Sequence, residues 1–155
     1  MTSRQQERGS NTVRLEFPAS LRFLSMVGAC LNDLLLKTQS QEEIEPVSYD
    51  IQLAVQELCT NIVCHAYKDQ PNDERICVTI TFYNYPRRVT IELEDTGKIF
   101  DEMQVEEPNL EEGQIHGYGL FLIKSLMDEV IYTRNADRNS WYLVKNLEEL
   151  VHPQS

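Results

Sequence analysis

The sequence predicts an α+β fold, a two-layer sandwich of a mostly antiparallel mixed sheet covered on one face by about three helices. Three observations lead to this prediction. The 155 residues match the usual size of one domain, which is large enough for an apolar core. Some segments repeat apolar residues every three or four positions, as helices do, and others alternate apolar with polar residues, as half-buried strands do. Their order is strand, two helices, two strands, helix and two strands, which is typical of α+β domains.

The first half of the chain predicts one strand and two helices. Apolar residues alternate over Thr12–Phe17, and Pro18 then ends the strand. A helical pattern runs from Ser20 to near Lys37. After a polar loop, Pro46 suits the first turn of a second helix, which we expect from about Val47 to Tyr67.

The second half predicts two hairpins on either side of a third helix. β-Branched and aromatic residues alternate in the first hairpin, and turn residues separate its strands. A long acidic loop from Asp95 to Gly113 precedes the helix. The expected elements are strands at Arg75–Tyr83 and Arg88–Leu93, a helix at Gly119–Val130, and strands at Val130–Thr133 and Ser140–Lys145 joined over Asn135–Asn139. We therefore expect a polar segment over residues 1–11, one domain over 12–147 and a tail over 148–155.

The charge balance narrows the classes of partner. Twenty-five acidic and 14 basic side chains give a formal net charge of −11. This charge argues against a nucleic-acid binder, which needs a basic face, and against docking on an anionic membrane. The sequence shows no signal-peptide pattern and no apolar run of the length that a membrane span requires. The cysteines form no CxxC or zinc pattern, so we expect buried, reduced thiols in a cytoplasmic protein.

Glu57, Asn61 and His65 stand four residues apart on the second expected helix, and α-helical geometry places them in line on its flank. An Asn side-chain oxygen is a hard ligand for a Mg²⁺ ion that keeps water and phosphates as its other ligands. A carboxylate one turn away is suited to orienting a nucleophile or taking its proton. The alternative is an ordinary solvated flank of a helix.

Asp95 ends a strand, and Gly97 follows it by two residues. A carboxylate in this place is able to accept a hydrogen bond from an exocyclic amine such as that of adenine. A glycine allows the backbone to approach a flat ring closely. The alternative is a plain Asp-x-Gly turn.

The segment His116-Gly117-Tyr118-Gly119-Leu120 opens the third expected helix. Two glycines before a helix free backbone N–H groups to surround phosphate, with the positive end of the helix dipole behind them. The pattern is neither a P-loop nor a Rossmann fingerprint, since GxxxxGK[ST] and a parallel βαβ unit are both missing from the sequence.

Taken together and in order, these motifs resemble the ATP-binding superfamily of gyrase, Hsp90-type chaperones, histidine kinases and mismatch-repair proteins. More narrowly, the chain resembles the bacterial anti-sigma factor serine/threonine kinases of the stress and sporulation switches. The matching segments are Glu57–Tyr67 (ELCTNIVCHAY), Asp95–Asp101 (DTGKIFD), Gly117–Ile123 (GYGLFLI) and Leu126–Val130 (LMDEV). The resemblance spans about residues 12–147 and implies a Bergerat-type ATP-binding fold.

The resemblance implies a role for each matching residue. Glu57 would be the general base that activates a serine hydroxyl on the protein substrate, and Asn61 would hold Mg²⁺ against the ATP phosphates. Asp95 would recognise the adenine amine, with Gly97 beneath the base. The other residues implied in nucleotide binding are His65, Lys98, His116, Gly117, Tyr118, Gly119 and Leu120.

The resemblance also implies partners. Such proteins are typically homodimers that sequester a sigma factor and phosphorylate a small anti-anti-sigma protein of the STAS type, without direct contact to nucleic acid or membrane. Relatives dimerise and grip sigma through the segment that matches Thr12–Lys37. Two departures keep alternatives open, since only His116 stands where relatives commonly carry a basic residue, and residues 101–112 are strongly acidic. The alternatives are an ATP-binding module that sequesters a partner without phosphoryl transfer, and a plain α+β domain without a nucleotide site.

Overall fold

A computed structural model of the chain describes residues 11–38, 41–66, 74–84, 86–97 and 118–147. Most of the two expected tails and of the acidic loop lies outside these ranges. The same is true of three expected site residues, Lys98, His116 and Gly117. The expectations for these segments and residues therefore stay predictions.

Five strands form one sheet in the order β1-β2-β3-β5-β4, and every neighbouring pair is antiparallel. The strands are β1 (Asn11–Pro18), β2 (Arg75–Asn84), β3 (Arg87–Asp95), β4 (Glu129–Asn135) and β5 (Arg138–Asn146). β3 lies in the middle of this order, so the residue that ends it, Asp95, has strands on both sides. Its partner in the ladder to β5 is Asn139.

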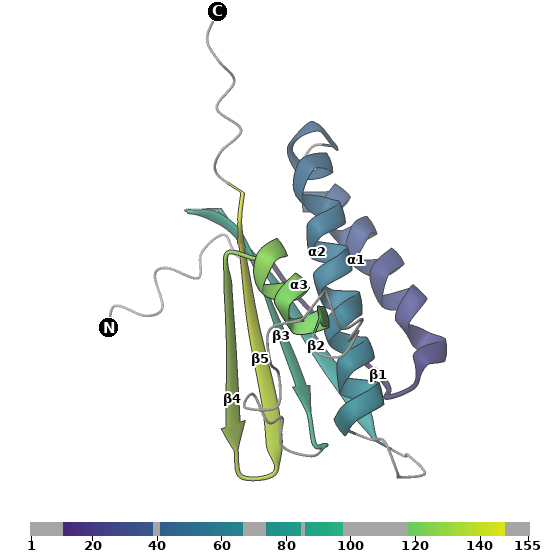
Figure 1. The fold of residues 1–155 in the computed structure, drawn as a ribbon. Coiled ribbons are helices and arrows are strands. Elements are labelled where there is room, and N and C mark those ends of the chain that lie inside the picture. Colours follow the sequence, from purple (N-terminus) through teal and green to yellow (C-terminus); the bar gives the residue numbers. More distant parts are fainter. Residues whose placement is uncertain (1–10, 39–40, 67–73, 85, 98–117, 148–155) are drawn as a thin grey trace, which may run out of the picture.

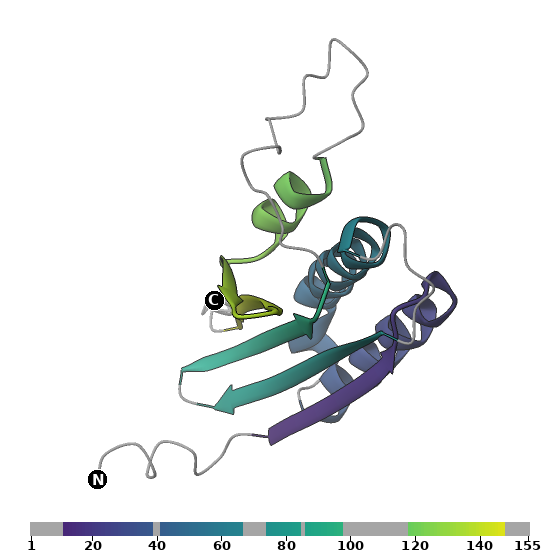
Figure 2. The same cartoon turned by 90° about the horizontal axis from the view of Figure 1, so that it is seen from below.

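Three helices cover one face of the sheet, which confirms the predicted α+β two-layer class (Figure 1, Figure 2). The described sheet is antiparallel throughout and not mixed as predicted. The helices are α1 (Leu24–Thr38), α2 (Gln41–Asn61) and α3 (Tyr118–Leu126), and α2 packs against both of the others. A 3-10 turn, η1 (Leu21–Phe23), leads into α1, and a π-helical turn, η2 (Ile62–Ala66), extends α2. None of the described helices is both long enough and apolar enough to cross a lipid bilayer.

The core lies between the sheet and the helices because both layers place their apolar side chains on one side. In β2 buried residues alternate with half-buried ones, and α2 adds an apolar stripe at three- and four-residue spacing. Removing such side chains from water stabilises the fold by about 25 cal/mol per Å² of apolar surface. Fully buried side chains from both layers include Leu31, Leu35, Ile51, Leu58, Ile80, Ile91 and Leu143.

α2 begins earlier than the sequence predicted. It starts at Gln41 and not near Val47, so that Pro46 lies inside the helix and not in its first turn. The side chain of Ile44 explains the extension, because it is 1% exposed and belongs to the core cluster. Burial of this side chain compensates for the backbone hydrogen bond that a proline within a helix is unable to donate.

The second hairpin is also longer than predicted. α3 ends at Leu126 instead of Val130, because β4 starts at Glu129 and pairs with β5. The turn predicted over Asn135–Asn139 shrinks to Ala136 and Asp137, since Asn135 pairs with Arg138. Asn139 is therefore a strand residue that lies directly opposite Asp95.

The prediction for the cysteines is confirmed in one respect and wrong in another. All four thiols are free, as expected. Only Cys59 is buried, and burial raises the pKa of its thiol to about 12. Cys64 is exposed, and Cys30 and Cys77 are half-buried, so the expected burial of all four is wrong.

Ala136, in the turn between β4 and β5, has a φ of 51°, which is left-handed backbone. A side chain in this region costs about 1–2 kcal/mol, which glycine avoids. We expect Ala136→Gly to stabilise the chain by about 0.5–1 kcal/mol, after the extra unfolded-state entropy of glycine is subtracted. Urea unfolding of Ala136→Gly beside Asp137→Gly measures this effect. Equal or greater stabilisation by the Asp137 variant would contradict the explanation.

Candidate active site

The expected site residues that the structure describes include the ends of three elements. β3 ends at Asp95, α2 ends at Asn61, and α3 begins at Tyr118. The sequence separates these elements widely, and the fold brings the last residues of α2 against the first residues of α3. Two clusters result, one around the carboxylate of Asp95 and one around the carboxamide of Asn61.

Asp95 belongs to a row of polar residues that runs across three strands. Sheet pairing places it opposite Asn139 of β5, which in turn lies opposite Arg134 of β4. Residues directly opposite in a ladder point to the same face. The three polar side chains therefore share the side of the sheet that the helices cover, at its edge, where the apolar core ends.

The carboxylate of Asp95 is satisfied on one oxygen only. Its Oδ1 accepts hydrogen bonds from the backbone N–H of Gly97 at 2.8 Å and from Asn139 Nδ2 at 2.9 Å. Its Oδ2 is buried and has no hydrogen-bond partner among the described residues. The bond from Gly97 is that of the Asp-x-Gly turn expected from the sequence, but this turn leaves a buried acceptor available for a ligand.

Burial raises the pKa of the Asp95 carboxyl, and the residue is only 3% exposed. Hydrogen bonds from Asn139 and Gly97 and the positive charge of Arg134 lower the pKa in part, while the carboxylate of Glu74 raises it. A raised carboxyl pKa means that the folded chain holds this proton more tightly than the unfolded chain. Ionised Asp95 therefore costs stability at neutral pH, and this cost disappears as the pH falls below the raised pKa.

Gly119, the second residue of α3, lies against the side chain of Asn61. A Cβ at Gly119 would stand 2.9 Å from Asn61 Nδ2 and 3.2 Å from Asn61 Oδ1. Real Cβ atoms do not approach a neighbour at 2.9 Å, so the missing side chain is what allows the half-buried carboxamide to lie beside the start of the helix. The expected metal ligand and the expected phosphate loop are thus in contact.

Glu57 is half-buried one turn before Asn61 on α2, as the spacing predicted. His65 differs, because its backbone belongs to the π-helical turn η2, in which hydrogen bonds join residues i and i+5. The α-helical stripe expected for Glu57, Asn61 and His65 therefore extends only as far as Asn61. Inserted π turns are frequent at functional sites.

The other expected residues are described only in part. Leu120 is buried in the core, so its side chain contributes to packing and only its backbone N–H at the helix start is suited to a ligand. The side chains of His65 and Tyr118 lie outside the described part of the structure. Lys98, His116 and Gly117 lie outside it entirely.

The sequence did not indicate Asn139, Arg134 or Tyr132 as site residues. Asn139 Oδ1 accepts hydrogen bonds from Arg134 Nη1 at 3.0 Å and from the hydroxyl of Tyr132, whose ring stacks at a tilt on Trp141. The asparagine was assigned to a turn because turns favour Asn. The strand register that brings Asn139 opposite Asp95 depends on contacts between residues far apart in the sequence.

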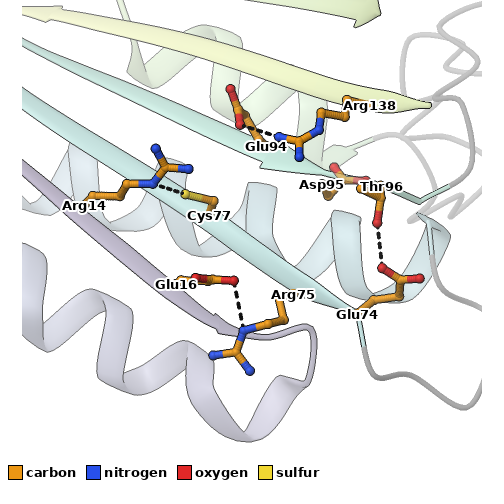
Figure 3. Close-up of a pocket in the computed structure, with 9 residues that line it drawn as sticks. All are labelled: Arg14, Glu16, Glu74, Arg75, Cys77, Glu94, Asp95, Thr96 and Arg138. Atoms are coloured by element: carbon orange, nitrogen blue, oxygen red, sulfur yellow. Dashed lines mark hydrogen bonds and ion pairs between the residues drawn. The ribbon is translucent and has the colours of Figure 1, made fainter. Parts of the chain in front are cut away.

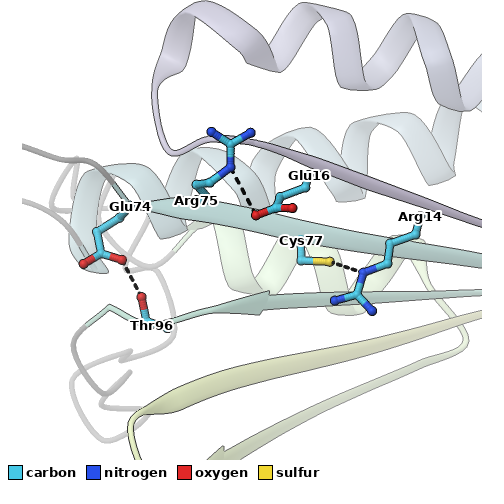
Figure 4. A network of polar contacts seen from close by, with 6 residues as sticks. All are labelled: Arg14, Glu16, Glu74, Arg75, Cys77 and Thr96. Carbon is cyan, nitrogen blue, oxygen red and sulfur yellow. Dashed lines mark hydrogen bonds and ion pairs between the residues drawn. The ribbon is translucent and has the colours of Figure 1, made fainter.

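On the opposite face of the sheet, which none of the described helices covers, lies a depression lined by strand residues (Figure 3). It encloses about 250 Å³. Two ion pairs line it: Arg75 Nε lies 3.1 Å from Glu16 (Figure 4), and Arg138 lies 3.3 Å from Glu94 (Figure 3). Arg14 Nε donates to the thiol sulfur of Cys77 at 2.9 Å. Asp95 reaches its edge, but Asn61 and Gly119 do not line it. The expected chemistry therefore lies on the helix-covered face.

Residues 17–145 match the family described as the histidine kinase-like ATPase domain. The chain belongs to this family. Two curated relatives place it more narrowly. The serine-protein kinase RsbW of Staphylococcus epidermidis is 32% identical over 127 residues, which cover 76% of each chain. The serine-protein kinase RsbW of Bacillus subtilis is 30% identical over 136 residues, covering 80% of this chain and 79% of that one. The family-level resemblance seen in the sequence motifs is confirmed.

Solved structures share the fold of this ATPase domain. The crystal structure of the RsbU and RsbW domains of Rv1364c from Mycobacterium tuberculosis matches with a TM-score of 0.64 at 18% identity, over 88% of this chain and 32% of that chain. The histidine kinase domain of a blue-light activated kinase from Erythrobacter litoralis matches with a TM-score of 0.50 at 18% identity, over 84% and 62% of the two chains. These likenesses establish the architecture into which the two clusters are built.

Gly119→Ala tests the contact between α2 and α3. Alanine normally stabilises a helix interior relative to glycine by about 0.8–1 kcal/mol. At Gly119 we expect instead a loss of about 1–2 kcal/mol, because the new Cβ collides with Asn61. Urea unfolding of Gly119→Ala, Asn61→Ala and the double variant forms a cycle in which the double variant recovers most of the loss.

Gly28→Ala is the matched control, because no described atom lies within 4 Å of a Cβ at this position of α1. It should be neutral or stabilising. Equal effects of the two alanine substitutions, or additive effects in the cycle, would remove the argument that Gly119 is required by Asn61.

Proposed function

We propose that this chain is an ATP-dependent protein serine/threonine kinase that acts as an anti-sigma factor. One observation supports a nucleotide site most directly. In a member of the histidine kinase-like ATPase family, the buried Asp95 keeps one carboxylate oxygen without a partner among the described residues. A buried unsatisfied acceptor costs free energy in the absence of a ligand, and an exocyclic amine would satisfy it.

The residues at the site fit the two parts of Mg-ATP. Oδ2 of Asp95 fits the 6-amino group of adenine as an acceptor. The half-buried carboxamide of Asn61 lies beside the first turn of α3, and its oxygen fits a Mg²⁺ ion. When bound, ATP would supply the transferable phosphoryl group, and Mg²⁺ would neutralise negative charge on the phosphate oxygens. Asn61 orients the phosphates, and the N-terminus of α3 stabilises their negative charge.

Glu57 acts as the general base in this proposal. Its carboxylate lies one turn from Asn61 on α2, on the same flank of the helix. It accepts the proton of a serine hydroxyl on the substrate protein as the oxygen attacks, so that the rate depends on positioning and electrostatics more than on covalent chemistry. The related serine-protein kinases RsbW make protein serine the expected acceptor.

The proposed partners are a sigma factor and a STAS-type anti-anti-sigma protein, with the chain acting as a homodimer in the cytoplasm. Three large apolar side chains, Leu21, Met26 and Leu36, are exposed on η1 and α1, within the segment that the resemblance assigns to dimer and sigma contacts. A net charge of −11 suits a protein that holds a basic DNA-binding partner rather than DNA itself.

A binding module without phosphoryl transfer is the second candidate function. The sequence favours it in one respect, since His116 replaces the basic residue that relatives commonly carry before the second glycine motif. Incubation with labelled ATP and an anti-anti-sigma protein of the same organism separates the two functions. Label on the partner identifies a kinase, and a tight complex without label identifies the module.

Glu57→Gln removes the proposed base but keeps the size of the side chain. We expect ATP affinity to change less than about threefold and phosphorylation of the partner serine to fall by about 10²–10⁴-fold, the usual contribution of a positioned base. Calorimetric ATP binding and label transfer measure the two quantities, and Glu129→Gln on exposed β4 is the control. Undiminished transfer by Glu57→Gln would rule out this role.

Asp95→Asn tests the base site. Asparagine keeps an acceptor for Gly97 and Asn139 but places an amino group where Oδ2 stands. We expect ATP affinity to fall by about tenfold to a hundredfold, from a lost bond of about 1.5–3 kcal/mol. Inosine triphosphate, which carries an oxygen at position 6, should bind more tightly to the variant than to the natural chain. Nucleotide titrations read by fluorescence or calorimetry measure both.

The free energy of unfolding of Asp95→Asn without nucleotide provides the control. Because burial raises the pKa of Asp95, replacing this carboxylate by a neutral amide should leave the fold as stable as before or more stable. A large loss of stability together with lost ATP binding would assign Asp95 to the fold and not to the ligand.

A further inference from the structure

Two polar side chains beside Asp95, Asn139 and Arg134, have so far been given no role in ligand binding. They continue the cross-strand row from β3 through β5 to β4. Asn139 is 2% exposed, so its amide has no access to water and must find its partners within the fold. The contacts on its two ends differ in kind, and this difference determines which way the amide points.

The nitrogen end of the Asn139 amide faces acceptors. Nδ2 donates to Asp95 Oδ1 at 2.9 Å and to the carbonyl oxygen of Gly97 at 3.3 Å. The oxygen end faces donors, namely Arg134 Nη1 at 3.0 Å and the hydroxyl of Tyr132. Every hydrogen-bonding position of this buried amide is therefore matched to its partner.

Of the two groups at the oxygen end, Arg134 is the one that enforces this orientation. A guanidinium carries donors only, whereas a tyrosine hydroxyl donates or accepts and would tolerate either end of an amide. Arg134 is itself held in place, because Nη1 also donates to the carbonyl oxygen of Gly97 at 2.9 Å and Nε donates to that of Ala136 at 3.2 Å. Its position is thus fixed by the turn of its own hairpin and by the end of β3.

The orientation of Asn139 controls which kind of hydrogen bond Asp95 offers. The hydrogen bond from Nδ2 to Oδ1 favours the ionised carboxylate, in which the Oδ2 that has no partner among the described residues is an acceptor. With the amide reversed, two oxygens would face each other, and a proton on the carboxyl group would relieve their repulsion. Oδ2 would then be able to donate. An acceptor fits the 6-amino group of adenine, and a donor fits the 6-oxo group of hypoxanthine or guanine.

We propose that Arg134 is a positioning residue for purine selection: by fixing the Asn139 amide, it keeps Asp95 Oδ2 an acceptor and so favours 6-aminopurine over 6-oxopurine nucleotides. This inference rests on the proposed nucleotide function, because it concerns the base contact of the same site. Arg134 acts through Asn139 and Asp95 and does not itself contact the base.

The test compares two substitutions at Arg134 that keep a polar side chain. Arg134→Gln retains hydrogen-bonding capacity but is able to accept as well as donate, so it no longer dictates the orientation of Asn139. Arg134→Lys carries donors only and should preserve the orientation. Arg138→Gln is the control on the same hairpin, because Arg138 lies on the opposite face and pairs with Glu94.

The measured quantity is the ratio of the dissociation constants of inosine triphosphate and ATP for each variant. We expect the natural chain, Arg134→Lys and Arg138→Gln to share one ratio in favour of ATP, and we expect this ratio to fall about fivefold or more in Arg134→Gln. If Arg134 had only a structural role, its substitution would weaken the binding of both nucleotides equally and leave the ratio unchanged. An unchanged ratio in Arg134→Gln, or an equal fall in Arg134→Lys, overturns the proposal.

Asp95→Asn, measured in the same titrations, separates this inference from the function on which it rests. If Asp95→Asn shifts the ratio and Arg134→Gln does not, the base contact stands and the positioning role of Arg134 is wrong. If the natural chain binds neither nucleotide, both the proposed function and the inference about Arg134 are wrong. Urea unfolding confirms that each variant is folded. Gln and Lys are similar in size, so a difference in the nucleotide ratio between the two Arg134 variants is not explained by packing.

Discussion

A buried carboxylate with one satisfied oxygen is the constraint on which the proposed nucleotide site depends. Asp95 ends the central strand, and burial makes its ionisation costly. The fold accepts this cost because Asn139 and the N–H of Gly97 satisfy Oδ1 and the charge of Arg134 opposes the effect of burial. The remaining oxygen, Oδ2, is the acceptor that we propose for the adenine amine. The buried carboxylate therefore lowers the stability of the free protein, and a ligand that donates a hydrogen bond to Oδ2 would recover part of this free energy.

The second support of the site is the contact between α2 and α3. At its N-terminal end α3 is held by the close approach of Gly119 to Asn61. At its C-terminal end Lys145 Nζ donates to the carbonyl oxygen of Leu126 at 2.6 Å and lies 3.6 Å from Asp50 of α2. A cation at the last carbonyls of a helix is favourable, because the helix dipole is negative there. Both ends of this short helix are therefore fixed relative to α2, which carries the proposed metal ligand and base.

Most of the fold follows from patterns that are local in the sequence. Alternating apolar residues predicted the strands, and apolar residues at three- and four-residue spacing predicted the helices. Both patterns are visible in the sequence because the period of apolar residues reflects which face of an element packs against the core. The errors occur where long-range contacts outweigh local preference. Burial of Ile44 moves the start of α2 back to Gln41, before Pro46, and pairing with β5 makes Glu129 a strand residue instead of a helix residue. The side chain of Asn139 favours a turn, but the ladder makes it a strand residue.

The sequence by itself determined the family and the proposed chemistry, because Glu57, Asn61, Asp95 and the glycines lie within short motifs whose spacing is visible along the chain. Only the tertiary structure decided how these groups are held. The π-helical turn separates His65 from the α-helical stripe, and sheet register brings Arg134, Asn139 and Asp95 into one row. Residues that are distant in sequence meet through strand pairing, and pairing depends on the burial of whole faces rather than on any local motif.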